Sequence, residues 1–250
     1  MNFTEAFAWL PLQTFFLFIM ERYSVITDKR PREIVLLRGK GCAYKRCRFC
    51  DYHLDCSPDD GQNYALNAEV LSRITGIYGE LEVINSGSVF ELDERTLDLI
   101  KTTCRDKGIS IIHFEAHYMY RDRLSALRLA FDGFTLKLKL GLETFDYAMR
   151  ENVLQKGITE RDPYVIAKGF DEANFLFGIN GQTAVSMIKD IELGLKHFER
   201  VCVNIMCENT TDVKPDAKVI EAFRSQVYPI YKNCTRVDIL LNNTDFGVGA

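Results

Sequence analysis

After about residue 30, short apolar segments rich in β-branched residues alternate with segments of helical spacing. The apolar segments lie at 34–38, 81–84, 109–114, 134–142, 174–179, 201–206 and 237–241. The helical segments lie between them at 66–78, 94–106, 121–131, 145–155, 182–197 and 216–232. Strands that alternate with helices, with no hairpin signal between them, predict a parallel sheet with its helices outside. Seven candidate strands in one run favour a barrel or partial barrel, with an open doubly wound sheet as the alternative.

The alternation inside the candidate strands predicts which side chains face the barrel interior. In residues 135–143 the leucines share one face, and Lys137, Lys139 and Glu143 share the other. The same parity turns polar residues of other strands inward: His113, Glu115, His117, Cys202, Asn204, Asp238 and Asn242. We interpret this interior as a ligand cavity, because buried charges without partners are costly. Buried ion pairs between lysine and glutamate are the alternative.

Charge and hydropathy exclude some classes of partner. The composition is that of a globular protein, and 31 Lys and Arg against 35 Asp and Glu give a net charge of −4. No basic run is present, so we expect no direct binding of nucleic acid. The apolar stretch 6–20 is too short to span a bilayer and contains Pro11 and Gln13, so we expect no membrane association. We find no secretory leader and expect a cytoplasmic protein.

The chain is expected to hold one barrel domain, residues 31–250, preceded by an N-terminal extension or helix at 1–30. Met20 is followed by ERYSVITDKRPREIVLLRG, which resembles the natural start of an α/β domain. We therefore hypothesise that the first 19 residues are an upstream extension of the reading frame. The alternative is a packed N-terminal helix.

Three cysteines, Cys42, Cys47 and Cys50, lie in the loop after the first long strand. Three thiolates in a short loop can hold three irons of a [4Fe–4S] cluster and leave the fourth iron open. Loops at the carboxyl ends of barrel strands are also where chemistry takes place. The alternative is a zinc-stapled binding module, in which Cys56 or His53 would complete a set of four ligands.

The cysteine loop and two further segments resemble the radical S-adenosylmethionine (SAM) superfamily from about residue 33 onward. The usual signature is Cys-x₃-Cys-x₂-Cys with an aromatic residue before the last cysteine; this chain keeps Phe49 but has four residues in the first gap. Asn85-Ser86-Gly87-Ser88-Val89-Phe90 resembles the family's glycine-containing loop. Gly141-Leu142-Glu143-Thr144, followed by Leu154-Gln155-Lys156-Gly157, resembles its fourth-strand motif. The resemblance implies an α/β fold, a partial TIM-like (β/α)₆ barrel.

The same resemblance implies two cofactors, a [4Fe–4S] cluster and SAM, and the residues that hold them. Cys42, Cys47 and Cys50 would bind iron, and Phe49 would lie near the adenine. Ser86, Gly87 and Ser88 would bind the methionine end of SAM, and Glu143 would lie near its ribose or amino group. An electron donor such as flavodoxin or ferredoxin would be a partner.

Within the superfamily the chain most resembles the queuine lyase family. This implies a carbon–nitrogen lyase of queuosine salvage that converts the free base queuine to 7-aminomethyl-7-deazaguanine through a 5′-deoxyadenosyl radical. The chain ends soon after the last candidate strand, so we expect a small nucleobase substrate and no appended RNA-binding domain; a radical SAM enzyme that modifies a tRNA base is the alternative. From strand parity, and from proximity to the cluster for the first two, we predict these substrate contacts: Lys45, His53, Glu115, His117, Asn204, Asp238 and Asn242.

Overall fold

One curled sheet organises the chain in the computed structural model, which describes residues 21–242. Its strands are β1 (Tyr23–Ile26), β2 (Arg32–Leu37), β3 (Glu80–Asn85), β4 (Ile111–Ala116), β5 (Thr135–Glu143), β6 (Glu172–Phe177), β7 (Arg200–Ile205) and β8 (Val237–Leu240). They lie side by side in chain order. Strands β2 to β8 are parallel to one another, as predicted.

The helices follow the strands in a regular succession. They are α1 (Asp60–Ser72), α2 (Glu94–Asp106), α3 (Leu124–Ala130), α4 (Pro163–Ala167), α5 (Ala184–His197), α6 (Ala217–Ala222) and α7 (Tyr228–Tyr231). Each strand from β2 to β7 is followed by helical structure before the next strand begins, and β8 completes the series. The predicted partial (β/α)₆ barrel is thus confirmed.

Strand β1 was not predicted, and it pairs antiparallel with β2. It has four residues, and the connection to β2 contains no glycine or asparagine. The connection instead takes a left-handed conformation at Lys29, with φ of 56°. The sequence analysis assigned no strand within the predicted N-terminal segment 1–30, and the connection has no Asn-Gly or Asp-Gly pair, which is the usual signal of a hairpin. Residues 1–20 of the predicted N-terminal extension, with the proposed start at Met20, lie outside the described residues.

Helix boundaries differ from the predictions where capping and proline decide them. Helix α1 begins six residues earlier than predicted, because the Asp59 side chain accepts a hydrogen bond from the Gln62 N–H and caps it. The predicted helix 216–232 is divided by a π-helical turn, Phe223–Val227, before Pro229 in α7. The predicted helix 145–155 is a π-helical turn at Ala148–Val153.

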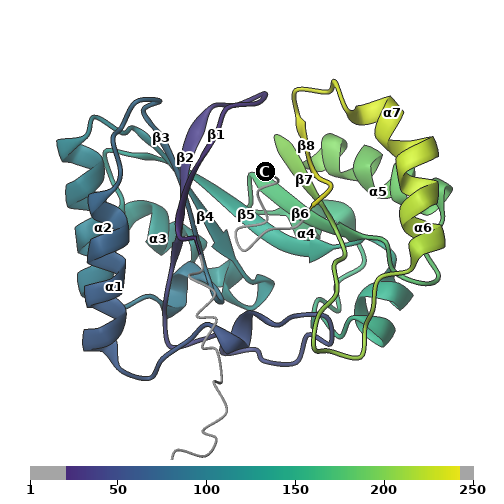
Figure 1. Cartoon of the computed structure of the whole chain (residues 1–250), viewed down its shortest axis with the longest axis horizontal. Helices are drawn as coiled ribbons and strands as arrows, with labels where there is room; N and C mark the ends of the chain where they lie inside the picture. The colour runs from purple at the N-terminus through teal and green to yellow at the C-terminus, as the bar shows by residue number, and fades with distance from the viewer. Residues whose placement is uncertain (1–20, 243–250) are drawn as a thin grey trace, which may run out of the picture.

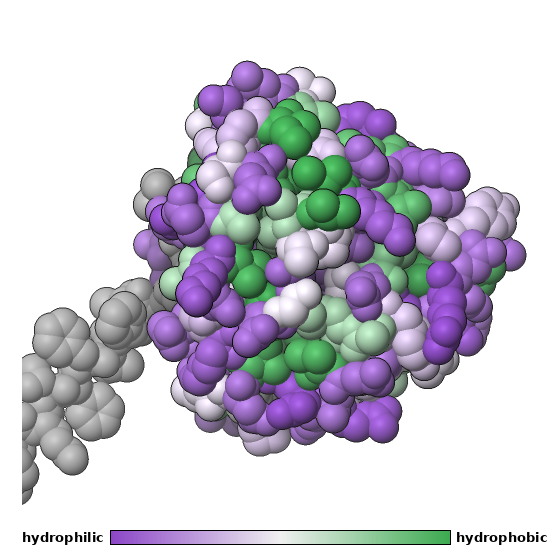
Figure 2. All heavy atoms as spheres, turned by 90° about the vertical axis from the view of Figure 1, so that its right-hand side faces the viewer, coloured by the Kyte–Doolittle hydropathy of each residue, from purple (hydrophilic) through white to green (hydrophobic). Residues whose placement is uncertain are grey.

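The helices cover the outer face of the sheet, and the core lies between the two layers. Figure 1 shows α1, α2 and α3 on one side of the curled sheet and α5, α6 and α7 on the other. Leu136, Leu138, Leu140 and Leu142 of β5 are buried in this layer, which confirms the predicted leucine face. On the outside of α5 and α6, hydrophilic side chains surround small groups of hydrophobic ones (Figure 2). Among the described residues, no helix has the length and apolar character needed to cross a membrane.

Candidate active site

A cavity of about 790 Å³ lies inside the curl of the sheet. It extends from the middle of the strands to the loops at their carboxyl ends. In Figure 1 these loops lie at the bottom of the molecule, and the segment that contains the cysteines runs below the sheet. The cavity brings together most of the predicted site residues: Cys42, Cys47, Phe49, Cys50, Gly87, Glu115, His117, Glu143, Asn204 and Asp238.

The other predicted residues lie elsewhere. Ser86 and Ser88 are buried beside the cavity, on either side of Gly87. Lys45 and Asn242 are exposed and are not among the lining residues. His53 belongs to the short 3₁₀ turn Tyr52–Leu54, and its side chain is not described. Strand parity thus predicts which side chains line the cavity more reliably in the middle of a strand than near its end or in a loop.

The cysteine loop is fixed by contacts to three other parts of the barrel. The Arg48 backbone N–H donates to the Leu154 carbonyl at 3.0 Å. Asp51 accepts hydrogen bonds from the Thr210 N–H at 2.7 Å and from its hydroxyl at 2.6 Å. The Ala43 N–H donates to Glu91 Oε1 at 2.7 Å. These contacts hold the thiols at the mouth of the cavity.

Gly87 allows the Ser86–Ser88 segment to approach the cysteine loop. A Cβ added at Gly87 would lie 2.1 Å from Glu91 Oε2 and 3.1 Å from the Cys42 Cα. The Ser88 N–H donates to the same Glu91 oxygen at 2.6 Å. A side chain at this position would displace the Glu91 carboxylate and press on the Cys42 backbone, so glycine favours this close contact between the two loops.

Asp55, which the sequence analysis did not select, supports this segment from the cavity wall. It accepts a hydrogen bond from the Ser86 hydroxyl at 2.8 Å and forms an ion pair with Arg22 at 2.5 Å. The Asp55 contacts therefore tie the predicted SAM-binding segment to the start of the sheet.

The buried Ser88 hydroxyl, in the same segment, has no hydrogen-bond partner among the described residues.

A buried ion pair lies next to the thiols. Lys156 Nζ is 2.9 Å from Glu143 Oε1, and both side chains line the cavity. The Lys156 ammonium also lies 5.4 Å from the centre of the Phe49 ring. Burial disfavours this ammonium, but the Glu143 carboxylate and the neighbouring Cys47 and Cys50 together outweigh burial and raise the pKa of Lys156. A permanent positive charge therefore lies beside the predicted cluster site.

The thiols themselves match the chemistry of an iron–sulfur cluster. Burial raises the pKa of the Cys47 thiol to about 12, while the Lys156 charge favours its thiolate. Bound iron would ionise such a thiol outright. No three His, Cys, Asp or Glu side chains in residues 21–242 are close enough to share one metal ion. A cubane cluster does not need such convergence, since each of its thiolates binds a different iron. The donor set therefore fits the cluster.

Glu115 and Asn174 form the middle of the cavity wall. The Asn174 amide donates to Glu115 Oε1 at 2.7 Å. Burial raises the pKa of Glu115, although the Lys139 charge opposes this shift. Asn174 was not predicted as a site residue; the signal was its polar side chain at the start of the apolar segment 174–179. Together these residues present both a carboxylate and an amide to the cavity.

His117 lines the cavity as a neutral ring. Its Nε2 donates to the Lys156 carbonyl at 3.1 Å, and its Nδ1 accepts the Met119 N–H at 3.2 Å. Burial lowers the pKa of His117 to about 4, with a further contribution from the Lys156 charge. Because both ring nitrogens bind the protein, His117 can offer a ligand its ring surface rather than a hydrogen bond.

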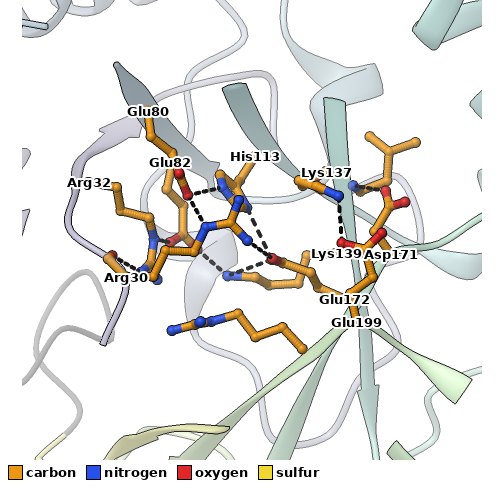
Figure 3. A network of polar contacts seen from close by, with 12 residues as sticks. Arg30, Arg32, Glu80, Glu82, His113, Lys137, Lys139, Asp171, Glu172 and Glu199 are labelled. Atoms are coloured by element: carbon orange, nitrogen blue, oxygen red, sulfur yellow. Dashed lines mark hydrogen bonds and ion pairs between the residues drawn. The ribbon is translucent and has the colours of Figure 1, made fainter. Parts of the chain in front are cut away.

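The deep end of the barrel is filled by ion pairs (Figure 3). His113 lies between two carboxylates, with Nε2 2.7 Å from Glu80 and Nδ1 3.1 Å from Glu172. Lys139 pairs with Glu82, which also binds the Arg32 guanidinium at 2.6 Å. The alternative of lysine–glutamate pairs is therefore correct for this part of the interior, and the cavity interpretation is correct for the part above it.

Asp238 joins this layer through arginines. Its carboxylate pairs with Arg200, whose Nε donates at 2.8 Å, and with Arg32 Nη2 at 3.4 Å. Asp238 still lines the cavity. Its oxygens are thus held by protein side chains, in contrast to Glu115, which makes no ion pair to lysine or arginine within the described chain.

Comparison with solved structures shows a strong similarity to a known enzyme. A queuine lyase from Clostridium spiroforme, solved with SAM and queuine bound, is 43% identical to this chain; the match covers 92% of this chain and 100% of that one, with a TM-score of 0.87. Streptococcus suis SuiB, solved with S-adenosylmethionine, is 13% identical over 82% of this chain and 46% of its own, with a TM-score of 0.50. This second likeness shows a shared fold alone. No protein-family model and no curated protein matches the chain.

The first similarity extends over the whole length of the lyase and over 92% of this chain. Its identity is well above the level at which only the fold is shared. The cysteine loop and the two other segments that suggested radical SAM chemistry lie around that cavity. The chain belongs to the queuine lyase family of radical SAM enzymes.

Proposed function

We propose that this protein cleaves the free base queuine at the C–N bond to its cyclopentenediol and releases 7-aminomethyl-7-deazaguanine. The observation that carries this proposal is the 43% identity to a lyase that was solved with SAM and queuine bound. The cavity supports it independently, because thiols, carboxylates and amides meet in a space of about 790 Å³. That volume lies within the usual range for a small-molecule site.

Cys42, Cys47 and Cys50 would hold a [4Fe–4S] cluster whose open iron takes SAM. Phe49 would lie near the adenine, while Ser86, Gly87 and Ser88 would bind the methionine end. Glu143 would accept the SAM amino group, held in place by Lys156 at 2.9 Å. The chemistry that the cluster and SAM would supply there is a 5′-deoxyadenosyl radical for removal of a hydrogen atom from the substrate.

The substrate would lie over the polar wall between β4 and β7. A guanine-like edge presents N–H donors, which a carboxylate accepts well. Glu115 is suited to this role because it has no cationic partner within the described residues, and Asn174 holds it in place. Asn204 lines the same cavity and would add an amide.

Other residues would orient the base without direct polar contact. His117 is neutral and fully hydrogen-bonded to the protein, so it offers a flat ring surface. Asp238 is held by two arginines and would act as part of the cavity floor. The contacts predicted for Lys45, His53 and Asn242 stay predictions, and Lys45 and Asn242 lie outside the lining of the cavity. Fixed walls of this kind keep the reacting bond oriented and exclude water.

We further propose an electron donor of the flavodoxin or ferredoxin type and a cytoplasmic location, where thiols remain reduced. We also propose that the enzyme acts on the free base rather than on nucleic acid. The volume of the cavity supports this, since it is within the usual range for a small-molecule site.

The test is anaerobic incubation of the reconstituted protein with SAM, dithionite and queuine, followed by mass spectrometry. We expect 5′-deoxyadenosine together with 7-aminomethyl-7-deazaguanine. Deoxyadenosine without base cleavage would contradict the substrate assignment. Neither product from a protein with a full cluster would contradict the enzymatic assignment.

Iron content tests the ligands separately from activity. Wild type should hold about four irons per chain. Single replacements of Cys42, Cys47 or Cys50 by alanine should lose most of this iron. Cys234→Ala is the matched control, because Cys234 does not line the cavity and should leave iron content unchanged.

A further inference from the structure

A second pocket, of about 600 Å³, lies beside the cysteine loop and outside the substrate cavity. Its side chains come from that loop, from the segment after β4 and from the segment that follows Gly157. Among the residues that line it are Tyr44, Arg46, Tyr118, Arg121, Glu160 and Arg161. We call it the arginine pocket, after its three arginines.

The arginines of this pocket are held in place by aromatic rings. The guanidinium of Arg46 lies 4.6 Å from the centre of the Tyr44 ring, and that of Arg121 lies 5.0 Å from the Tyr118 ring. Arg161 lies 3.8 Å from the Tyr147 ring. Stacking of this kind orders a guanidinium while its N–H groups stay available to a partner. The pocket therefore presents ordered positive charge.

The charge of this pocket is opposite to that of the protein as a whole. The chain carries a net charge of −4, whereas the pocket contains three arginines and one glutamate. The Glu160 carboxylate is already hydrogen-bonded to its own segment: its Oε1 accepts the backbone N–H groups of Arg161 at 2.7 Å and Asp162 at 2.9 Å. Positive charge concentrated on an acidic protein favours an acidic partner and sets its orientation.

Two stacked aromatic rings, Tyr44 and His117, lie between the arginine pocket and the substrate cavity. The Tyr44 ring stacks on His117, with ring centres 4.6 Å apart and 24° between the planes, and His117 lines the cavity. The Tyr44 hydroxyl donates to the Gln155 carbonyl at 2.8 Å. Gly157, with φ of 75°, makes room for it, since a Cβ there would lie 2.4 Å from the hydroxyl. Tyr44 and Arg46 both belong to the loop that carries the cysteines.

We propose that the arginine pocket is the docking site of an acidic one-electron donor protein of the flavodoxin or ferredoxin class. This rests on the proposed function, which requires a reduced cluster at Cys42, Cys47 and Cys50. One electron leaves the donor's reduced flavin or iron–sulfur centre and enters the cluster; the donor is oxidised by one electron, the cluster is reduced by one, and no bond or proton is exchanged. A donor docked here reaches the cysteine loop without entering the substrate cavity.

An RNA partner is disfavoured by the small extent of the positive charge. Nucleic-acid binding sites follow the phosphate backbone with a patch or stripe of basic residues. Here three arginines gather in one pocket of a chain that is acidic overall. A compact acidic surface of a donor protein matches this arrangement better.

The test compares two reductants on the reconstituted holoenzyme. The triple variant Arg46→Glu, Arg121→Glu and Arg161→Glu reverses the pocket, and the double variant Arg121→Glu and Arg161→Glu leaves the cysteine loop unchanged. The matched control reverses three exposed residues on the far helices α5 and α6 and the turn after α6: Lys196→Glu, Lys218→Glu and Arg224→Glu. The readout is the rate at which the cluster's visible absorbance bleaches with reduced flavodoxin or with dithionite.

With flavodoxin at low salt, we expect the pocket variants to be reduced at least about tenfold more slowly than wild type and the control variant. With dithionite, all should be reduced at the same rate. Equal rates with flavodoxin would overturn the proposal, as would a slowing that is the same for both reductants. Loss of tRNA binding in the pocket variants with unchanged flavodoxin rates would overturn it in favour of RNA. If flavodoxin reduces wild type faster than the pocket variants but queuine is not cleaved, the proposed function fails and the docking site stands.

Discussion

Lys156 Nζ lies 2.9 Å from Glu143 Oε1, on the wall that also carries the cysteine thiols. Both side chains are about nine-tenths buried. The pair connects two segments that the sequence analysis recognised together, the end of β5 and the turn before Gly157. Its ammonium lies near the Phe49 ring and compensates negative charge on that side of the cavity. The Lys156 ammonium is thus a buried cation on the same cavity wall as the cysteine thiols and the Glu143 carboxylate.

Removal of this cation should destabilise the protein. Lys156→Met leaves the Glu143 carboxylate buried without its partner, so we expect the free energy of unfolding in urea to fall by about 3–5 kcal/mol. The double variant Lys156→Met with Glu143→Met should recover part of the loss, because it removes both charges. The control is Lys40→Met, which breaks the exposed pair with Asp60 and should have no measurable effect. An equal loss in Lys156→Met and Lys40→Met would contradict this account.

Gly87→Ala should weaken SAM binding. The new Cβ would lie 2.1 Å from Glu91 Oε2 and would force the segment away from the cysteine loop. Overpacking of this size costs about 1–3 kcal/mol, which corresponds to binding weaker by roughly fivefold to 150-fold. Equilibrium binding of SAM to the reconstituted protein measures the effect. Gly61→Ala, in helix α1, is the control and should bind SAM as wild type does; unchanged affinity in Gly87→Ala would exclude the proposed role of the segment.

Glu115 and Asp238 are both cavity carboxylates, and they should respond differently to neutralisation. Glu115→Gln replaces an acceptor with a donor, so we expect the KM for queuine to rise about tenfold to a hundredfold. Asp238→Asn disrupts the pairs with Arg32 and Arg200 and should lower thermal stability with a smaller change in KM. Steady-state kinetics and thermal unfolding separate the two. A KM effect confined to Asp238→Asn would reverse the assignment.

The ion pairs at the deep end predict a pH dependence of stability. Burial alone would lower the pKa of His113, but its hydrogen bonds to Glu172 and Glu80 raise it above its usual value of 6.5. The stability contributed by protonated His113 is therefore fully present below pH 6.5 and is lost as the pH rises through the raised pKa. Burial would raise the pKa of Glu172, but His113 and Lys139 lower it to about 2. The Glu172 contribution is therefore present above pH 4.5 and is lost as the pH falls toward 2.

Anaerobic urea unfolding of the holoenzyme at increasing pH above about 6.5 checks the His113 part of this prediction. Wild type should lose stability with rising pH more steeply than His113→Gln, which has no proton to release. His197→Gln changes a histidine in the last turn of α5, outside the network, and should follow the wild-type profile. Parallel profiles for wild type and His113→Gln would count against the network as the source of the dependence.

Local patterns predicted the parts of the site that depend on strand parity and on short motifs. Period-two alternation placed Glu115, His117, Asn204 and Asp238 on the cavity side, because β4, β7 and β8 are regular at those positions. The three cysteines and Gly87 were found because their spacing is a local property. Such features need no knowledge of distant contacts.

Long-range pairing explains what the sequence analysis missed. Asp55 became part of the site through Ser86 and Arg22, which lie 31 and 33 residues away along the chain. The partners of Asp238 are Arg32 of β2 and Arg200 of β7, neither of which strand parity selected. Asn242 follows the end of β8 and is exposed, so parity no longer determines its direction. Which residues form an ion pair depends on the register between strands, and the residue pattern within one strand does not show that register.

The two ends of the curled sheet are joined by side chains rather than by backbone. Arg32 of β2 reaches Asp238 of β8 at 3.4 Å, and the Lys29 ammonium donates to the Val237 carbonyl. A closed barrel of eight strands has an interior that side chains nearly fill, yet this sheet of eight strands encloses about 790 Å³. The unclosed seam accounts for that room. The width of this seam depends on the few side chains that bridge it. Longer or shorter side chains at these positions would therefore change the volume of the cavity without breaking the hydrogen bonds between neighbouring strands.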